Sequence, residues 1–471
     1  MMRKPDLPLT QDLVLIGGGH THALVLRKWL MKPLPGVRVT LINPGPTAPY
    51  SGMLPGFVAG HYTRDQLDID LVRLAHAAGA RLVLGSATGL DLTVGTVLTD
   101  SHPPIGFDAL SVDVGITSDM PALPGFAEHA IPAKPLGPFA ARWEAYSLGQ
   151  GSASVAIIGA GVAGVELSMA MAHALRRRKR DATVHLIDAA TALSGLPRRS
   201  AHRLREALTA QGVHLIENAD ITHLTERTLH LADGTTIQAD FITGAAGAKP
   251  YPWLADTGLS THNGFVTVDK HLRTSDPRVF AVGDCAHMAH DPRPKAGVYA
   301  VRQAPALLHN LKASLSNGPL KPYVPQKDYL KLISLGEKSA LGDRFGLTFT
   351  GGWVWDWKDR IDRKFMNQFD DLPKMPKPAL PYPRAKGVSD ALGSKPLCGG
   401  CGAKVGRSAL SEALARLAPS QRADVTPLPG DDAALLTTGG TKQVFTTDHL
   451  RAFWADPVVM ARIATHHALG D

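Results

Sequence analysis

The sequence predicts an α/β protein in which one Rossmann-like domain is nested inside another. Two glycine-rich loops support this prediction: GGGHTH at 17–22 and GAGVAG at 159–164 each follow a short apolar run and precede a helix-forming stretch. A continuous apolar run is typical of a strand buried on both faces of a parallel sheet. Strand, glycine turn and helix together are the context of dinucleotide binding. The loops lie about 140 residues apart, as the loops of two nested nucleotide sites do.

The composition excludes several classes of protein. A chain of 471 residues exceeds the usual size of one hydrophobic core, so we expect two or three domains. Three cysteines in this length argue against a disulfide framework and for a reducing compartment. The N-terminus lacks the apolar segment of a secretory signal, and no apolar run approaches the roughly 20 residues of a membrane span. A net charge of +8 selects no anionic partner by itself.

The first glycine loop opens the N-terminal nucleotide site. Gly17 permits a tight turn, and Gly19 lets backbone N–H groups approach a pyrophosphate at the start of the next helix. The second strand, VRVTLIN, ends at Asn43, where an acidic residue normally binds a ribose. His22 also departs from the pattern, because it stands at the third Gly or Ala position. An ordinary tight turn of an α/β fold is the alternative interpretation.

The second glycine loop matches the full dinucleotide spacing. Gly159, Gly161 and Gly164 are followed by the strand TVHLID, which ends at Asp188 at the expected distance. An acid at this position favours the 2′-hydroxyl of NADH and repels the 2′-phosphate of NADPH. The basic run RRRKRD at 176–181 ends the following helix, and we interpret it as a solvated helix end rather than a nucleic-acid patch.

Two later segments complete the first site. DPRVFAVGDCAHM at 276–288 predicts an apolar strand that delivers Gly283 and Asp284, with a helix after them. A carboxylate at such a strand end can accept hydrogen bonds from a polyol. DFITGAAGAKP at 240–250 predicts another strand and a Gly/Ala turn that contains Gly247.

The order of these motifs, with T-G-A at 243–245 and V-G-D at 282–284, resembles the flavoproteins with two dinucleotide-binding domains. The resemblance runs from about residue 12 to residue 370. It is most specific to the type II NADH dehydrogenase and sulfide:quinone reductase branch of the pyridine nucleotide-disulfide oxidoreductase superfamily. It implies FAD at the first loop, NADH or NADPH at the second, and hydride transfer from the nicotinamide to flavin N5.

The resemblance also assigns site residues. It places Glu166 and Lys134 near the flavin and the nicotinamide as catalytic residues, and Asp284 on the flavin ribitol. It places the segment 48–62 beside the isoalloxazine ring and the helix at 297–311 against the flavin pyrimidine ring. The implied cofactor-binding residues are Gly17, Gly19, His20, Asn43, Tyr50, Ser51, Gly159, Gly161, Gly164, Asp188, Gly247, Gly283, Asp284, Gln303 and Ala304.

The electron acceptor is a separate question. The disulfide reductases of the superfamily need a cysteine pair beside the flavin, and none occurs before residue 398. Cys285 is single, and we interpret it as a small packed residue. The acceptor is therefore a quinone, oxygen or another small molecule. The alternative from another class is a sensing module without catalysis, in which His22 and Asn43 reflect weakened flavin binding.

The segment 351–369 has an interfacial pattern. Trp353, Trp357, Ile361 and Phe365 recur at helical spacing, and cations occupy the rest of the helical wheel. These cations are Lys358, Arg360, Arg363 and Lys364. We expect a cytoplasmic protein, and a helix packed on the flavin domain is the first interpretation of this segment. Because type II dehydrogenases dock on membranes through C-terminal helices, contact with the inner face of the membrane is the other interpretation.

The pattern along the chain gives a domain plan. We expect an oxidoreductase over 1–370, whose FAD-binding parts span about 10–130 and 265–330. The NAD-binding insert spans about 150–262, and an amphipathic segment spans 340–370. A Pro-rich linker at 371–396 and a further domain from 397 follow. We expect a second copy of this chain as a partner, and no nucleic acid.

The C-x-x-C in KPLCGGCGAKVG at 395–406 has three interpretations. A zinc site needs two more ligands at comparable spacing. A redox dithiol is the second interpretation. The third is a nucleophilic thiol, since Lys404 lies three residues after Cys401 and a nearby cation favours the thiolate. Aspartates further along suit Mg²⁺ bound through phosphates, which indicates phosphoryl transfer.

This C-terminal part resembles the beginning of selenide, water dikinase. The motifs G-C-G-x-K, G-D-D-A-A and T-T-D occur in order over about 75 residues. The resemblance implies that Cys401 and Lys404 are catalytic, and that Mg²⁺ and ATP are held by Asp432, Asp448 and Asp471. We expect a truncated α+β segment without kinase activity of its own, and a selenium species as a candidate acceptor for the flavin.

Overall fold

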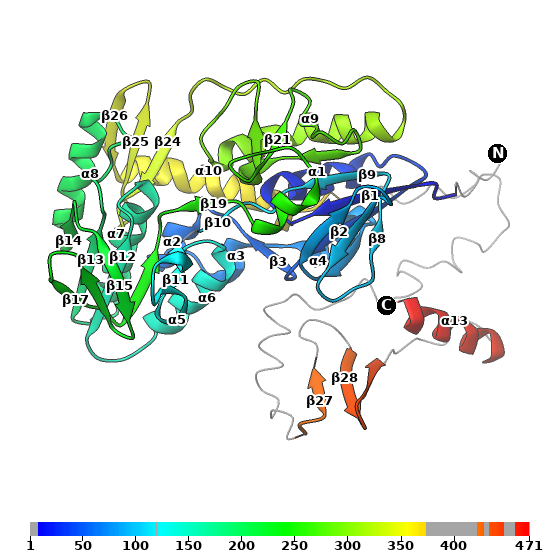
Figure 1. Cartoon of the computed structure of the whole chain (residues 1–471), viewed down its shortest axis with the longest axis horizontal. Helices are drawn as coiled ribbons and strands as arrows, with labels where there is room; N and C mark the ends of the chain where they lie inside the picture. The colour runs from blue at the N-terminus through cyan, green and yellow to red at the C-terminus, as the bar shows by residue number, and fades with distance from the viewer. Residues whose placement is uncertain (1–7, 119, 374–421, 428–432, 447–456, 471) are drawn as a thin grey trace, which may run out of the picture. The chain divides into compact units, whose positions relative to one another are not determined.

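The computed structural model describes residues 8–118, 120–373, 422–427, 433–446 and 457–470 (Figure 1). The chain divides into two compact units. One unit is Pro5–Met375, and the other combines Met1–Lys4 with Pro376–Asp471.

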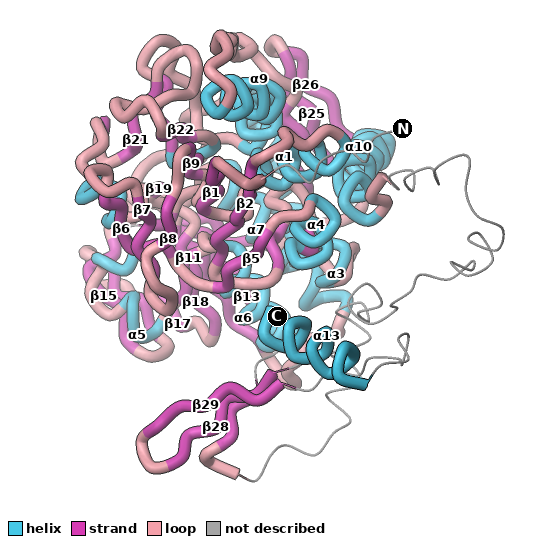
Figure 2. Tube along the Cα trace, turned by 90° about the vertical axis from the view of Figure 1, so that its right-hand side faces the viewer, coloured by secondary structure: helices cyan, strands magenta, loops and turns pink. Residues whose placement is uncertain are grey.

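The first Rossmann-like domain is built on a five-stranded parallel sheet. Its strand order is β22-β9-β1-β2-β5, and Figure 2 shows the strands in this order across the molecule. The apolar run 13–16 is buried, as expected for a strand covered on both faces. The five strands are β1 (Gln11–Ile16), β2 (Val37–Asn43), β5 (Arg81–Leu84), β9 (Ala109–Val112) and β22 (Val279–Ala281).

The second Rossmann-like domain repeats this plan. Its parallel sheet has the order β11-β18-β12-β13-β14. Its strands are β11 (Ile131–Pro132), β12 (Ala153–Ile158), β13 (Ala182–Ile187), β14 (Val213–Ile216) and β18 (Phe241–Gly244). All five lie in the chain between β9 and β22 of the first sheet. The prediction of two nested Rossmann-like domains is therefore confirmed.

The helices of both domains connect strands in the same way. One helix joins β1 to β2 in the first domain and β12 to β13 in the second, and another helix leads into the next parallel strand, β5 or β14. These helices are α1 (His20–Met31) and α4 (Leu71–Ala78) in the first domain, and α7 (Val162–Arg177) and α8 (Arg198–Ala210) in the second. Further helices are the short α2 (Leu54–Val58), α3 (Arg64–Leu67) and α5 (Phe126–His129), and the longer α6 (Leu136–Ser147).

An antiparallel meander stands at the same place in each domain, directly after β5 in the first and after β14 in the second. In the first domain it is β6 (Ala87–Asp91), β7 (Thr96–Thr99) and β8 (Ile105–Gly106). In the second it is β15 (Ile221–Thr225), β16 (Thr228–Leu231) and β17 (Thr236–Gln238). Two short pairs, β3 (Thr47–Pro49) with β4 (Asp68–Asp70) and β10 (Thr117–Ser118) with β19 (Ala248–Lys249), link the segments between them.

The chain after the second domain returns to the first. A small sheet consists of β20 (Thr261–His262), β21 (Phe265–Val268) and β23 (Ala286–Met288). Strand β22 of the first sheet lies between β21 and β23 in the chain. The sequence predicted a helix after Asp284, and the structure places a strand between them. β23 follows Asp284, because it pairs in parallel with β21, and helix α9 (Gly297–Leu315) begins later.

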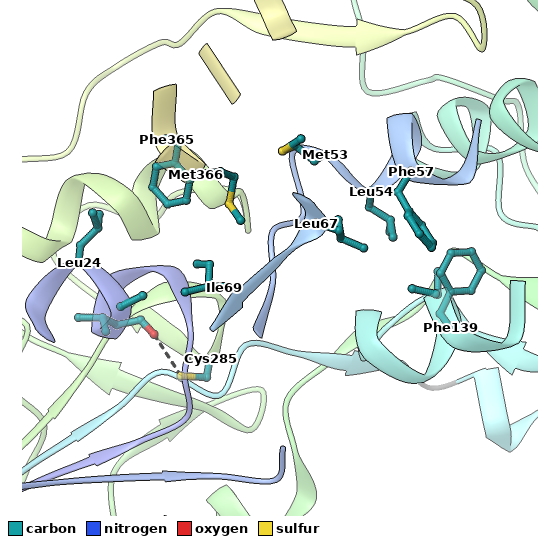
Figure 3. Packing of buried hydrophobic residues seen from close by; sticks show 14 of the residues in the cluster. Leu24, Met53, Leu54, Phe57, Leu67, Ile69, Phe139, Cys285, Phe365 and Met366 are labelled. Atoms are coloured by element: carbon teal, nitrogen blue, oxygen red, sulfur yellow. Dashed lines mark hydrogen bonds between the residues drawn. The ribbon is translucent and has the colours of Figure 1, made fainter. Parts of the chain in front are cut away.

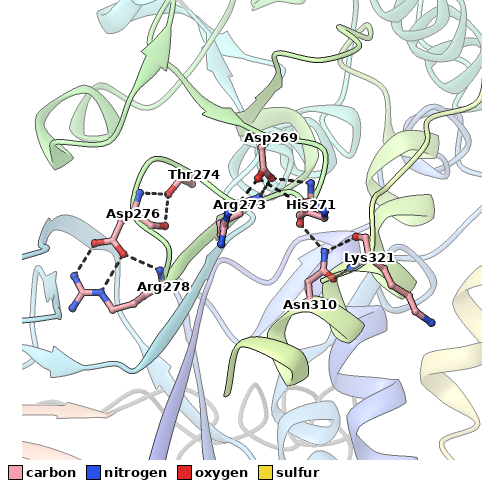
Figure 4. Close-up of polar contacts among 8 residues, drawn as sticks. All are labelled: Asp269, His271, Arg273, Thr274, Asp276, Arg278, Asn310 and Lys321. Atoms are coloured by element: carbon pink, nitrogen blue, oxygen red, sulfur yellow. Dashed lines mark hydrogen bonds and ion pairs between the residues drawn. The ribbon is translucent and has the colours of Figure 1, made fainter. Parts of the chain in front are cut away.

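A polar clamp fixes the segment before β22 (Figure 4). The Asn310 side chain on α9 donates from Nδ2 to the carbonyls of His271 and Lys321 at 2.7 and 2.9 Å, and it accepts from Lys321 N at 2.8 Å. The Asp269 carboxylate accepts from the backbone N–H groups of His271 and Arg273. Because buried polar groups are costly without partners, this clamp specifies one path for the chain.

The C-terminal part of this unit is a three-stranded sheet and a long helix. The strands are β24 (Lys331–Ser334), β25 (Ala340–Arg344) and β26 (Leu347–Gly351), and the helix is α10 (Gly352–Asp370). Figure 3 shows Phe365 and Met366 of α10 near Met53 and Ile69, within one cluster of buried apolar side chains that runs through both domains.

The second unit contains an antiparallel sheet and a helix among its described residues. The sheet consists of β27 (Val425–Pro427), β28 (Ala433–Thr438) and β29 (Thr441–Thr446). The helix is α13 (Pro457–Gly470). Strands and a helix of this kind were expected there, but they do not test the resemblance to selenide, water dikinase.

Candidate functional site

A cavity of about 640 Å³ opens at the carboxyl ends of β1, β2, β9 and β22. Its volume falls within the range of small-molecule and cofactor sites. In parallel α/β sheets, ligands bind at this edge because the loops after the strands meet there. Eight of the residues predicted as catalytic or cofactor-binding line the cavity: Gly17, Gly19, His20, Asn43, Ser51, Lys134, Gly283 and Asp284.

Asn43 holds the glycine loop in place. Its Oδ1 accepts from Gly18 N at 2.8 Å, and its Nδ2 donates to Gly45 O at 2.7 Å. The side chain predicted as a ribose ligand therefore bonds to the backbone on both sides, and lies at the wall of the cavity.

His22 is fully buried behind the same loop. Its Nδ1 lies 2.7 Å from Gly17 O and its Nε2 lies 2.8 Å from the Ser111 hydroxyl. Burial lowers the pKa of His22 to about 4, so the ring is neutral. Since a carbonyl only accepts, Nδ1 carries the proton and Ser111 donates to Nε2. His22 thus ties α1 to β1 and β9, where the usual fingerprint has a small residue.

Asp284 and Lys134 meet inside the cavity. Lys134 Nζ lies 3.1 Å from Asp284 Oδ2, and Lys134 follows β11 of the second sheet whereas Asp284 follows β22 of the first. Gln303 on α9 supports this turn, because its Oε1 accepts from Gly283 N at 2.7 Å. Gln303 and the buried Ala304 do not line the cavity themselves.

Tyr50 lies behind the cavity wall rather than in its lining. Its ring stacks on Phe365 at 4.5 Å and meets His20 edge-on at 5.1 Å. Its hydroxyl donates to Asp362 Oδ1 at 3.2 Å. Burial lowers the pKa of His20, which keeps this ring uncharged at neutral pH. The aromatic cluster joins the glycine loop to α10.

The second glycine loop follows β12 of the other sheet, in the predicted order of strand, glycine loop and helix. Helix α7 begins directly after Gly161, and a Cβ on Gly164 would overlap the Gly159 carbonyl. Asp188 follows β13, and its carboxylate accepts from Ala160 N at 2.5 Å. Asp188 therefore stands beside the loop, at the place where an acid selects a ribose hydroxyl.

Gly247 lies further along, just before β19, with a φ of +68°. None of the residues predicted for the second nucleotide site lines the 640 Å³ cavity.

Glu166 is half-buried on α7, and its carboxylate accepts from Ser334 N at 2.7 Å. Burial raises the pKa of Glu166 to about 7, although the charge of Lys358 opposes this effect.

Lys358 was predicted on the polar face of an amphipathic helix, and this is wrong. The side chain is buried, with Nζ 2.6 Å from both Asp362 Oδ2 and Gly52 O. Phe365, predicted on the interfacial stripe, is also buried. The i, i+4 spacing of Lys358 and Asp362 was visible in the sequence, but it does not reveal burial.

The residues predicted for the C-terminal enzyme lie outside the described residues. This holds for Cys401, Lys404, Asp432, Asp448 and Asp471. In the parts of the chain that the structure describes, no group of three or more His, Cys, Asp or Glu side chains is placed to hold a metal ion.

Comparison with known proteins identifies the class. Residues 11–304 match the family described as pyridine nucleotide-disulphide oxidoreductase. The chain belongs to this family of flavoprotein oxidoreductases that use NAD(P)H. Within it, the sequence is similar to proteins named as NADH dehydrogenase-like and as NADH:quinone oxidoreductase.

Two curated relatives support this placement. The chain is 28% identical over 343 residues to the NADH dehydrogenase-like protein YutJ of Bacillus subtilis, covering 70% of this chain and 92% of the relative. It is 32% identical over 215 residues to a type II NADH:quinone oxidoreductase of Haemophilus influenzae, covering 41% of this chain and 48% of that protein.

A solved structure has the same fold. The sulfide:quinone oxidoreductase of Aquifex aeolicus matches with a TM-score of 0.63 and 18% identity, over 76% of this chain and 91% of that one. At this identity the likeness concerns the fold alone.

Proposed function

We propose that the chain is an FAD-dependent NADH dehydrogenase, which passes electrons from NADH through the flavin to a quinone. The observation that carries this proposal is the cavity at the carboxyl edge of the first sheet. There the glycine loop, Asn43, Lys134 and Asp284 converge, although they are far apart in the sequence. The second glycine loop with Asp188 supplies the nucleotide site of a hydride donor.

The residues present fit FAD. The glycine loop stands at the N-terminus of α1, where backbone N–H groups favour a pyrophosphate. The Asp284 carboxylate can accept hydrogen bonds from the ribitol hydroxyls, and the cation of Lys134 holds that carboxylate in place. When bound, the flavin accepts two electrons as a hydride and releases them to a second substrate.

The protein's own groups position the donor and manage protons. Asp188 would hold the adenosine ribose of NADH, as the acid at this position does in dinucleotide folds. Glu166 is a half-buried acid whose pKa of about 7 suits proton exchange near neutral pH. The Lys358–Asp362 pair lies close to it and fixes the local charge.

A quinone is the favoured acceptor because of the exposed face of α10. Trp353, Trp357 and Ile361 keep 58, 38 and 42% of their surface exposed and recur every four residues. Phe345 and Leu347 of the neighbouring hairpin are exposed as well. We propose that this apolar face contacts a membrane surface, from which a quinone would arrive. None of the helices in the described residues has the length and apolarity to cross a membrane.

The full-length protein tests the membrane contact. We expect it to sediment with anionic vesicles at low salt, and Trp353→Ala with Trp357→Ala to reduce the bound fraction severalfold. Val94→Ser removes an exposed apolar side chain elsewhere and should leave binding unchanged. Equal binding of the tryptophan variant and the control would contradict the proposal.

The acceptor is tested by turnover. Reduced enzyme mixed with quinones, oxygen and selenium compounds in a stopped-flow instrument should be reoxidised fastest by a quinone. If oxygen or selenite reoxidises it as fast, the quinone assignment fails.

The relation of 397–471 to selenide, water dikinase stays a prediction from the sequence motifs. A role of the flavin in selenium metabolism has the same basis. NADH oxidation that proceeds equally fast with and without selenite would remove that basis.

A further inference from the structure

Asp113 is a buried carboxyl group that no dinucleotide fingerprint predicts. It follows β9 in the sequence SVDVG, is 4% exposed, and lines the 640 Å³ cavity. Its backbone N–H bonds to Ile16 O, so the residue is fixed next to the end of β1. Because burying a charge is costly, a carboxyl group buried in the cavity wall needs a physical reason.

The carboxyl group caps helix α1 from a neighbouring strand. Asp113 Oδ2 accepts from Thr21 N at 3.0 Å and from His22 N at 3.1 Å. Gly19 precedes this helix and supplies no side-chain cap. Asp113 therefore takes the inner N–H groups of the helix terminus. Gly17 N and Gly18 N already donate to Ile42 O and Asn43 Oδ1, so the N–H groups of Gly19 and His20 are the ones that remain for a ligand.

The same carboxyl group fits between two glycines. A Cβ at Gly19 would overlap the Asp113 carboxyl group, and so would a Cβ at Gly283. Asp113 thus touches both the glycine loop and the turn that carries Asp284. These are the two parts of the cavity that would hold the pyrophosphate and the ribitol.

We propose that Asp113 is a positioning residue that joins the glycine loop to the Gly283–Asp284 turn and makes retention of the flavin dinucleotide sensitive to pH. This inference rests on the proposed FAD-binding function. The physical reason is that an ionised Asp113 and a bound pyrophosphate share one helix terminus, where their charges repel.

The surroundings of Asp113 place its titration near neutral pH. Burial raises the pKa of Asp113 to about 7, the hydrogen bond from His22 N opposes this, and the charge of Asp284 adds to it. The other titratable groups nearby are His22, which is neutral, the buried Cys285 thiol, Lys134 paired with Asp284, and Lys295. At low pH the protonated Asp113 does not repel a bound pyrophosphate, whereas at high pH the Asp113 carboxylate repels it.

The test is FAD binding to the apoprotein of the full-length chain. From about pH 6 to about pH 9 we expect FAD affinity to fall roughly tenfold, which corresponds to a shift of one unit in the pKa of Asp113 on binding. Asp113→Asn keeps an oxygen that accepts from both N–H groups but loses the charge. Its affinity should be independent of pH in this range. Calorimetry in buffers of different ionisation enthalpy should show proton uptake for the wild type and none for Asp113→Asn.

Asp108→Asn is the matched control. Asp108 stands at the other end of β9, and its carboxylate also accepts from a backbone N–H, that of Asp12. This variant should keep the pH profile of the wild type. If Asp113→Asn does not fold, proton uptake by the wild type decides alone. FAD binding without pH dependence or proton uptake overturns this inference, whereas no FAD binding at any pH overturns the proposed function.

Discussion

His22 and Asn43 depart from the dinucleotide fingerprint in the sequence, and the structure gives both a structural role. Each side chain bonds to the backbone of the glycine loop, so the departures hold the loop rather than abolish it. The fingerprint predicted the loop and its place before a helix. It could not predict Ser111 or Asp113, because these partners come from a strand about 90 residues away.

His22→Ala should lower the free energy of unfolding by about 2–4 kcal/mol. The change leaves the Ser111 hydroxyl and the Gly17 carbonyl without their partner and opens a cavity under α1. Urea denaturation measures the effect. His76→Ala on the exposed face of α4 serves as the control and should change the value by less than about 0.5 kcal/mol. Equal effects of the two changes would contradict the role assigned to His22.

Glu166→Gln should stabilise the protein in a pH-dependent manner. Burial raises the pKa of Glu166 from 4.5 to about 7, so the folded state holds the proton more tightly than the unfolded state does. The wild type therefore loses stability as the pH rises through this window, by up to roughly 3 kcal/mol. Gln keeps the acceptor for Ser334 N and avoids this loss. Denaturation should show that Glu166→Gln and the wild type differ little in stability at about pH 4 and differ strongly at about pH 8. A difference that does not vary with pH would refute the assignment.

At the scale of elements, periodicity and glycine spacing predicted the strands and helices around the loops well. The strand VRVTLIN is β2 itself, and the helix after the second loop is α7. Helix α10 was expected too, but its orientation was not. Lys358 looks like a surface cation in the sequence, and only the packing of Asp362 and Gly52 around it shows that it is buried.

Gly164→Ala tests the second loop. The new Cβ meets the Gly159 carbonyl, so we expect the loop to move and the KM for NADH to rise about tenfold or more, with FAD still bound. Gly161→Ala is the matched control for folding, because a Cβ there meets nothing within 4 Å. Unchanged NADH binding in Gly164→Ala would show that this loop does not hold the nucleotide.

Lys358→Ala tests the ion pair inside α10. It leaves the Asp362 carboxylate buried with only Tyr50 as a side-chain partner, which should cost about 3–5 kcal/mol of stability. Lys364→Ala, on the exposed side of the same helix, should cost less than about 0.5 kcal/mol. Thermal and urea denaturation compare the two. A loss as small as that of the control would mean that the pair contributes little.

For the whole molecule, the nested plan was predictable from three motifs. The two glycine loops mark the start of the two domains, and the V-G-D segment marks the return of the chain to the first domain. The sequence did not predict that both domains share one order of strands, helices and meander, since the short strands of the meanders carry weak patterns. The motifs of the C-terminal part fall mostly outside the described residues, so that resemblance rests on the sequence.

The most direct test of the central claim is an anaerobic titration of the purified full-length protein with NADH. We expect the protein to carry about one flavin per chain, and NADH to bleach its visible absorbance fully at a lower concentration than NADPH does. A protein that binds no flavin, or a bound flavin that NADH does not reduce, would contradict the assignment as an NADH dehydrogenase.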